Sequence, residues 1–219
     1  MSGFTDRVSQ GILNHIVGKT ALFTMSTAYV ALFTANGVDA GTGFTECSGG
    51  NYARVATAGA DWNSASGSAP STITNANALT FPTATAGWGN VIAFGLYDAA
   101  SAGNLLAWDF FGAYAWLPAT VAAASPAVLT AKTHGYSLGD LVEWTIEYGG
   151  INPTFSASNF TGILTVASPS TDTFTVQNSS VNVNTSATGN GMVRKLISQT
   201  ISSGVQPAFP PSSLTITSS

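Results

Sequence analysis

Charged side chains are scarce in this sequence. Asp, Glu, Lys and Arg make up 7% of its 219 residues, against about 25% in an ordinary globular protein. The six basic residues are scattered and the formal net charge is −4, whereas nucleic-acid binding needs a clustered basic surface. We therefore expect no nucleic-acid partner. Because low charge gives little repulsion between copies, we expect much of the surface to be covered in an assembly; the alternative is a Ser/Thr-rich soluble monomer.

Cysteine and long apolar segments are also rare. Cys47 is the only cysteine, so no intrachain disulfide can form, and a buried, inert thiol is the simplest interpretation. No apolar run approaches the 18 or so residues of a membrane helix, and the N-terminus lacks the charged and apolar regions of a signal peptide. We expect no membrane association.

Motifs for catalysis and metal binding are missing as well. The sequence contains no H-E-x-x-H, G-x-S-x-G, P-loop or C-x-x-C pattern, and the glycine-rich loop 36–50 lacks the ligand spacing of a calcium loop. Two carboxylate pairs, Asp98 with Asp109 and Glu143 with Glu147, have the chemistry that a glycosidase uses, but solvated positions explain them better. We predict a non-enzymatic protein with no cofactor and no metal.

The first twenty residues contain the one convincing helical pattern. Phe4, Val8, Ile12 and Ile16 recur every four positions, and Leu13 widens the apolar stripe. A helix of about twelve residues is marginal in isolation, so the stripe must pack on its own sheet or on a neighbouring subunit. We predict these five side chains as an interface.

After the helix the apolar period changes from four to two. "AYVALFTA" (28–35) predicts a strand, and "VIAFGLYDA" and "NLLAWDF", joined by "ASAG", predict a β-hairpin. Ile92, Phe94 and Leu96 should face the core, while the small opposite face should receive a second layer, with "GAYAWLP" (112–118) as a candidate. The fold class that we predict is mainly β: an antiparallel β-sandwich or jelly-roll-like domain with a short N-terminal α-helix and a small inserted all-β domain.

The spacing of predicted strands and turns changes at Ala119. "AVLTA", "LVEWTIE", "ILTVAS" and "TFTVQ" predict a small β unit, and "SLTITS" near the C-terminus is an alternating strand that must pair to be ordered. We predict a main domain of residues 1–118 plus 197–219, with 119–196 inserted. The insert carries four aromatic residues that could face a ligand, or could instead form its core: Tyr136, Trp144, Tyr148 and Phe155.

Several motifs together resemble one protein family. "YVALFT", "E-x-SGG-x-YAR", "N-x-LTFP-x-AT-x-x-WG" and "FGLYDAASAGNLL" look like those of small structural proteins from tailed phages and prophages, often labelled tail fibre or minor structural protein. The insert is similar to a small β module that recurs in phage tail and fibre proteins. The resemblance implies a virion protein and brings no catalytic residue with it.

We therefore predict a non-enzymatic bacteriophage virion structural protein, located on the capsid or tail surface and assembled in the bacterial cytoplasm. The first hypothesis is a capsid decoration (cement) or head-fibre protein, whose partners are copies of itself and the major capsid protein or other virion proteins. Precedent among virion proteins favours a homotrimer. The alternative is a tail fibre or receptor-binding protein that recognises a host surface glycan.

Overall fold

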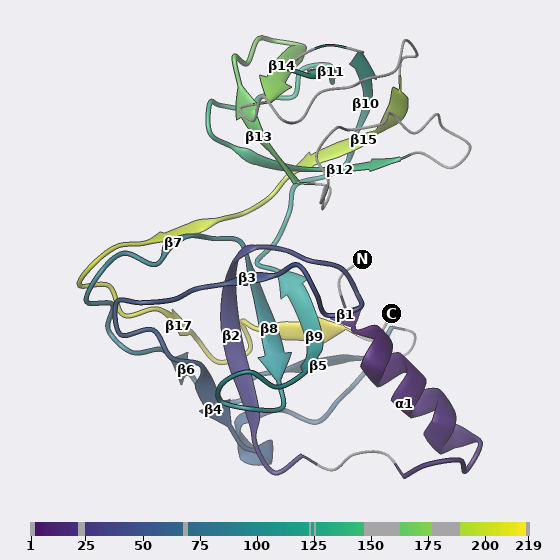
Figure 1. Ribbon diagram of the computed structural model, residues 1–219, viewed down its shortest axis with the longest axis vertical. Helices are drawn as coiled ribbons and strands as arrows, with labels where there is room; N and C mark the ends of the chain where they lie inside the picture. Colours follow the sequence, from purple (N-terminus) through teal and green to yellow (C-terminus); the bar gives the residue numbers. More distant parts are fainter. Residues whose placement is uncertain are drawn as a thin grey trace. The chain divides into compact units, whose positions relative to one another are not determined.

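The computed structural model describes residues 3–21, 25–67, 70–122, 124, 126–146, 163–176 and 189–217. The chain forms two compact units: unit 1 is Met1–Phe111 with Ser198–Ser219, and unit 2 is Gly112–Ile197. Every strand pairing in the described ranges is antiparallel (Figure 1). The predicted mainly β fold with a short N-terminal helix is confirmed, while independent folding of an inserted domain at 119–196 stays a prediction.

Unit 1 is built on one antiparallel sheet. In spatial order its strands are β1 (Gly3–Phe4), β9 (Leu105–Phe110), β8 (Ala93–Tyr97), β2 (Ala28–Ala35) and β3 (Thr45–Glu46), and β4 (Val55–Thr57) also pairs with β2. β2 has the bounds that its alternating sequence predicts, and β8 and β9 form the predicted hairpin. Local alternation was therefore sufficient to find the centre of this sheet.

Three two-stranded ribbons form a second layer against one face of the sheet. They are β16 (Gln199–Ile201) with β7 (Gly89–Val91), β17 (Ala208–Phe209) with β6 (Leu79–Thr80), and β18 (Thr215–Thr217) with β5 (Thr72–Thr74). A short 3₁₀ helix, η1 (Gly59–Asp61), precedes β5. Val30 and Phe94 of the sheet meet Phe81 and Leu214 of the ribbon layer in one buried core. In each ribbon, one strand comes from the C-terminal segment after unit 2.

The opposite face of β8 is covered by a loop of unit 1 itself. Gly95 lies on this face, and a Cβ atom there would come within 2.5 Å of the Phe33 ring. Phe33 contacts Phe44 of the loop before β3, and Phe44 contacts Trp108, with ring centroids 4.8 and 5.1 Å apart. The sequence-based candidate for this layer, residues 112–118, is wrong, because that segment belongs to unit 2.

The helix α1 (Asp6–Ile16) is tied to the sheet at its start. Phe4, expected on the helix, instead lies in β1 and pairs with β9. Thr5 holds the N-cap position, but its hydroxyl donates to the carbonyl oxygen of Leu105 at 2.9 Å rather than to a helical N–H. Gly18 follows the helix with φ of +71°, the conformation in which glycine ends helices. The orientation of α1 is thus set by β9.

Unit 2 is a closed barrel. Its six strands, in order, are β10 (Leu117–Ala122), β11 (Val128–Thr130), β14 (Thr173–Val176), β13 (Ile163–Ala167), β12 (Leu141–Ile146) and β15 (Gly189–Lys195). The sequence predicted four of these strands but neither β10 nor β15, whose pairing closes the barrel. Trp144 packs over Gly191, where a Cβ atom would lie 2.6 Å from the indole. Small and large residues therefore complement each other inside the barrel.

Asn75 anchors the C-terminal segment to unit 1. Its side chain is fully buried. Its Oδ1 accepts a hydrogen bond from the N–H of Leu214 at 2.8 Å, and its Nδ2 donates to the carbonyl oxygens of Asn77 and Pro210 at 2.8 and 2.7 Å. One amide thus holds the chain that returns from unit 2.

We predict that Asn75→Ala lowers the free energy of unfolding by about 3 kcal/mol, because it leaves buried backbone groups without partners. Urea denaturation followed by tryptophan fluorescence measures the change. Asn77→Ala is the matched control, since its side-chain bonds are exposed, and it should cost less than about 1 kcal/mol. Equal losses in the two variants would contradict the anchoring role.

Candidate interaction site

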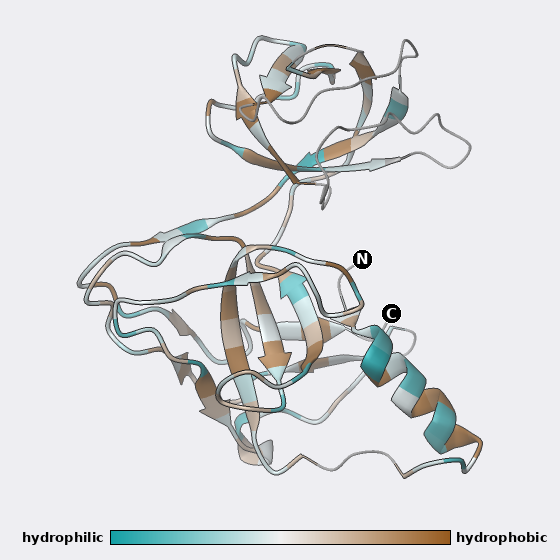
Figure 2. Cartoon of the chain, in the orientation of Figure 1, coloured by the Kyte–Doolittle hydropathy of each residue, from teal (hydrophilic) through white to brown (hydrophobic). Residues whose placement is uncertain are grey.

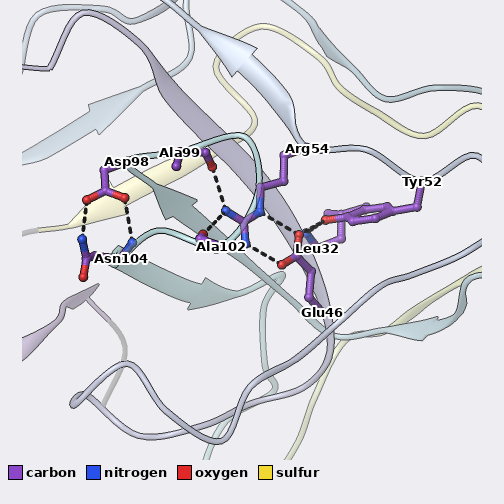
Figure 3. Close-up of polar contacts among 8 residues, drawn as sticks. All are labelled: Leu32, Glu46, Tyr52, Arg54, Asp98, Ala99, Ala102 and Asn104. Atoms are coloured by element: carbon purple, nitrogen blue, oxygen red, sulfur yellow. Dashed lines mark hydrogen bonds and ion pairs between the residues drawn. The ribbon is translucent and has the colours of Figure 1, made fainter.

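Arg54 forms a buried ion pair behind the loop that joins β8 to β9 (Figure 3). Its side chain is 6% exposed, and its Nε and Nη2 donate to the two carboxylate oxygens of Glu46 at 2.8 and 2.7 Å. Its Nη1 donates to the carbonyl oxygens of Ala99 and Ala102 at 2.7 and 2.8 Å. The guanidinium also lies 3.5 Å from the ring centroid of Tyr97. A single side chain therefore links β3 and β8 to the hairpin loop.

Tyr52 extends this cluster into the core. Its hydroxyl donates to Glu46 at 2.9 Å and accepts the N–H of Leu32 at 3.0 Å, and burial raises the pKa of Tyr52, so the phenol stays neutral. Its ring packs edge-on against Trp88, with centroids 5.1 Å apart, and the Trp88 indole donates to the carbonyl of Gly50 at 3.0 Å. The "E-x-SGG-x-YAR" and "WG" motifs are thus parts of one structural cluster.

The hairpin loop is also fixed from within. The Asp98 carboxylate accepts the backbone N–H and the side-chain amide of Asn104 at 2.7 and 2.6 Å (Figure 3). Burial raises the pKa of Asp98, but the hydrogen bonds from Asn104 outweigh it, and the net pKa lies below the ordinary value. Together with the bonds from Arg54, this contact gives the loop a defined shape.

None of these groups forms a reactive centre. Cys47 is 4% exposed, and burial, followed by the charge of Glu46, raises the pKa of Cys47 to about 12; only the thiolate is a nucleophile. Asp109, paired with Asp98 in the sequence analysis, accepts the neighbouring N–H of Phe110 at 2.7 Å. In the ranges that the structure describes, no three His, Cys, Asp or Glu side chains gather as metal ligands.

The second carboxylate pair of the sequence analysis lies in unit 2. Glu143 forms an ion pair with Arg194 at 2.7 Å, and Glu147 lies outside the described residues.

Among the described residues, α1 and the other helical segments are too short or too polar to cross a membrane.

The predicted interface stripe on α1 divides into a packed and an exposed part. Val8 is 8% exposed and Phe4 packs against the unit 1 core, whereas Ile12 is only partly buried. Leu13 and Ile16 are 65% and 72% exposed. Figure 2 shows hydrophobic residues recurring along the second half of the helix. The first part of the stripe therefore holds the helix on its own sheet, and the second part stays largely exposed.

An apolar groove lies at the foot of α1. Its volume is about 390 Å³, and its lining includes Phe4, Val8, Met25, Ile73, Leu96, Leu106 and Ile216. Val17, 74% exposed, continues the exposed stripe beyond the last turn of the helix. We call this groove, together with Leu13, Ile16 and Val17, the α1 surface. The groove lining is mostly apolar, and the three side chains at the end of the helix are apolar and exposed.

Tyr136 and Trp144 belong to the barrel core. They are 8% and 5% exposed, and Tyr136 contacts the ring of Phe174, with centroids 5.5 Å apart. Of the two interpretations that the sequence left open, the structure supports the core for these two residues, because a small closed barrel needs large side chains to fill its interior. Tyr148 and Phe155 lie outside the described residues.

Within the described part of unit 2, Tyr114 and Trp116 are aromatic residues that lie nearer the surface than Tyr136 and Trp144. Tyr114 is 60% exposed. Trp116 lies 4.4 Å from the guanidinium of Arg194, which also donates to Glu143. The alternation of small and aromatic residues in "GAYAWLP" is the signal that could have identified them, but its apolar character suggested a covering layer instead.

A family model described as podophage GP4 fiber I protein gp80 matches residues 3–115, slightly more than half of the chain. This chain belongs to that family. The match contains α1, the Arg54 cluster and the β8–β9 hairpin, and it confirms the resemblance to phage fibre-type proteins that the motifs indicated. The protein is therefore a bacteriophage virion structural protein. Curated protein sequences give no match.

We predict that Arg54→Ala lowers the free energy of unfolding by about 3–5 kcal/mol, because it leaves Glu46 without its counter-charge and two loop carbonyls without donors. Chemical denaturation measures the loss, and limited proteolysis should show new cleavage in the hairpin loop. Arg194→Ala removes an arginine that is more exposed than Arg54 and should cost about 1 kcal/mol or less. A similar loss in both variants would show that burial of Arg54 is unimportant.

We also predict that Cys47 resists iodoacetamide in the folded protein at neutral pH, because its pKa of about 12 leaves almost no thiolate. Mass spectrometry should detect alkylation only after denaturation in urea. Rapid alkylation of the native protein would contradict the burial of this thiol.

Proposed function

We propose that this protein is the subunit of a short fibre on the virion surface, and that copies of it associate through the α1 surface. The membership of a fibre-protein family supports the location. The exposed apolar side chains at the end of α1 are the observation that supports association of copies through this surface. The proposed fibre has no long shaft, because the described residues contain neither a coiled coil nor a repeated structural unit.

The α1 surface favours a second copy of the chain as its partner. An eleven-residue helix is marginal alone, and burying Leu13, Ile16 or Val17 should each stabilise an assembly by about 1–2 kcal/mol. Every copy carries both an exposed apolar helix end and an apolar groove. The helix of one copy can therefore occupy the groove of the next, and we propose that these head-to-tail contacts close into a ring rather than an open filament. We propose a homotrimer, on the precedent of other virion proteins.

Capsid decoration is the second candidate function. The compactness of the two units favours it, because neither contributes an extended shaft in the described ranges. In this alternative the α1 surface would contact the major capsid protein or another virion protein. Quantitative mass spectrometry of purified virions separates the two functions: a small fixed number of copies supports a fibre, and a number close to that of the capsid subunits supports decoration.

We predict that the native protein is oligomeric and that the double variant Leu13→Ser with Ile16→Ser is monomeric, because the change removes two of the three exposed apolar side chains at the end of α1 without touching the unit 1 core. Light scattering coupled to size-exclusion chromatography measures the mass. Val205→Ser, at a 40% exposed apolar position outside α1, is the matched control and should remain oligomeric. A native protein that is monomeric at high concentration would contradict the assembly proposal.

A further inference from the structure

A groove on unit 2 runs over β10, β11 and β15. Its volume is about 420 Å³, which falls in the range of small-ligand sites. The lining combines the apolar residues Leu117 and Pro118 with four polar side chains: Thr120, Thr130, Lys132 and Asn190. The groove thus offers an apolar surface and several hydrogen-bonding groups on three neighbouring strands.

The strand register brings three of the polar side chains into one row. Thr120 of β10 pairs with Asn190 of β15 on one side and with Thr130 of β11 on the other. All three are exposed. Because neighbouring strands lie about 4.8 Å apart, two hydroxyls and one amide follow one another across the sheet. Each of these groups both donates and accepts hydrogen bonds, as the hydroxyls of a sugar require.

Pro118 and Lys132 complete the lining of the groove. Pro118 lies in β10, two residues before Thr120, and so shares the outer face of that strand with it. Lys132 lies in the turn that follows β11. Both residues are exposed and both line the groove, which therefore offers a proline ring and an ammonium group as well as the polar row.

Lys132 gives the groove its charge. The lining residues that the structure describes include no Asp or Glu. Within the described part of unit 2, Lys132 is the basic residue without an ion pair, whereas Arg194 and Lys195 pair with Glu143 and Asp140 at 2.7 and 2.8 Å. In a chain with only six basic residues, an unpaired ammonium next to neutral polar groups favours a ligand that carries a negative charge.

We propose that this groove binds a carboxylated saccharide. Lys132 receives the carboxylate, Thr120, Thr130 and Asn190 hydrogen-bond the sugar hydroxyls, and Pro118 contacts an apolar face of the ring. The biological use of the site rests on the proposed fibre function, since a protein on the virion surface meets the polysaccharides of the host cell. The site itself lies wholly in unit 2 and does not involve the α1 surface.

The test measures binding of the purified full-length protein to immobilised alginate and polysialic acid, which carry carboxylates, and to dextran, which is neutral. We expect binding to at least one carboxylated polysaccharide and none to dextran. Lys132→Met should weaken the affinity about tenfold, and Thr120→Val should weaken it several-fold, because each removes a hydrogen-bonding partner of the sugar. Lys19→Met, which removes an exposed ammonium from unit 1, is the matched control and should leave the affinity unchanged.

Three results would overturn this site: no binding to either carboxylated polysaccharide, equal binding to dextran, or an unchanged affinity in Lys132→Met. Thermal unfolding of each variant verifies that the barrel is intact, as expected for exposed substitutions. The oligomeric state is measured on the same samples. An oligomer that binds no saccharide would overturn the groove alone, and a monomer that binds it would overturn the assembly proposal alone.

Discussion

The buried guanidinium of Arg54 sets the local geometry of unit 1. Burying a charge is costly unless its hydrogen bonds and counter-charge are supplied, and here Glu46, two loop carbonyls and the Tyr97 ring supply them. The planar fork of arginine can make these contacts in several directions at once, which a lysine cannot do. The family motif around Tyr52 and Arg54 therefore records a structural requirement: the hairpin loop must be held against β3.

The low charge of the chain does not leave the sheet of unit 1 exposed, although the composition alone suggested that much of the surface needs a partner. The sheet of unit 1 does not need another subunit to cover it, because the ribbons bury one face and the Phe44 loop covers the other. Among the described residues of unit 1, three of the five exposed large hydrophobic side chains lie together at the end of α1, at Leu13, Ile16 and Val17, and the other two are Val38 and Val205. A short helix and its groove are therefore the surface through which we propose assembly, and the low charge only permits the close approach of copies.

Local patterns predicted the strands well and the long-range contacts poorly. β2 and the β8–β9 hairpin follow from alternation within a few residues. The sequence analysis missed β10 and β15 because their pairing joins segments about seventy residues apart. The local sequence pattern gives no signal that these two strands close a barrel. Phe4 fits a period of four and yet lies in β1. The burial of Tyr136 and Trp144 depends on the closure of the barrel, and the polar row of the groove at Thr120 depends on the strand register.

The connection of unit 2 to the rest of the chain explains how one protein can combine both proposed roles. Its first and last strands pair with each other, and the N–H of Ile197 donates to the carbonyl of Gly112 at 2.9 Å, so the chain leaves and re-enters unit 1 at neighbouring points. The family match ends at residue 115, close to this junction. A barrel connected in this way can change its surface residues while Arg54 and Asn75 keep their partners in unit 1. Ligand binding and assembly are then free to vary separately.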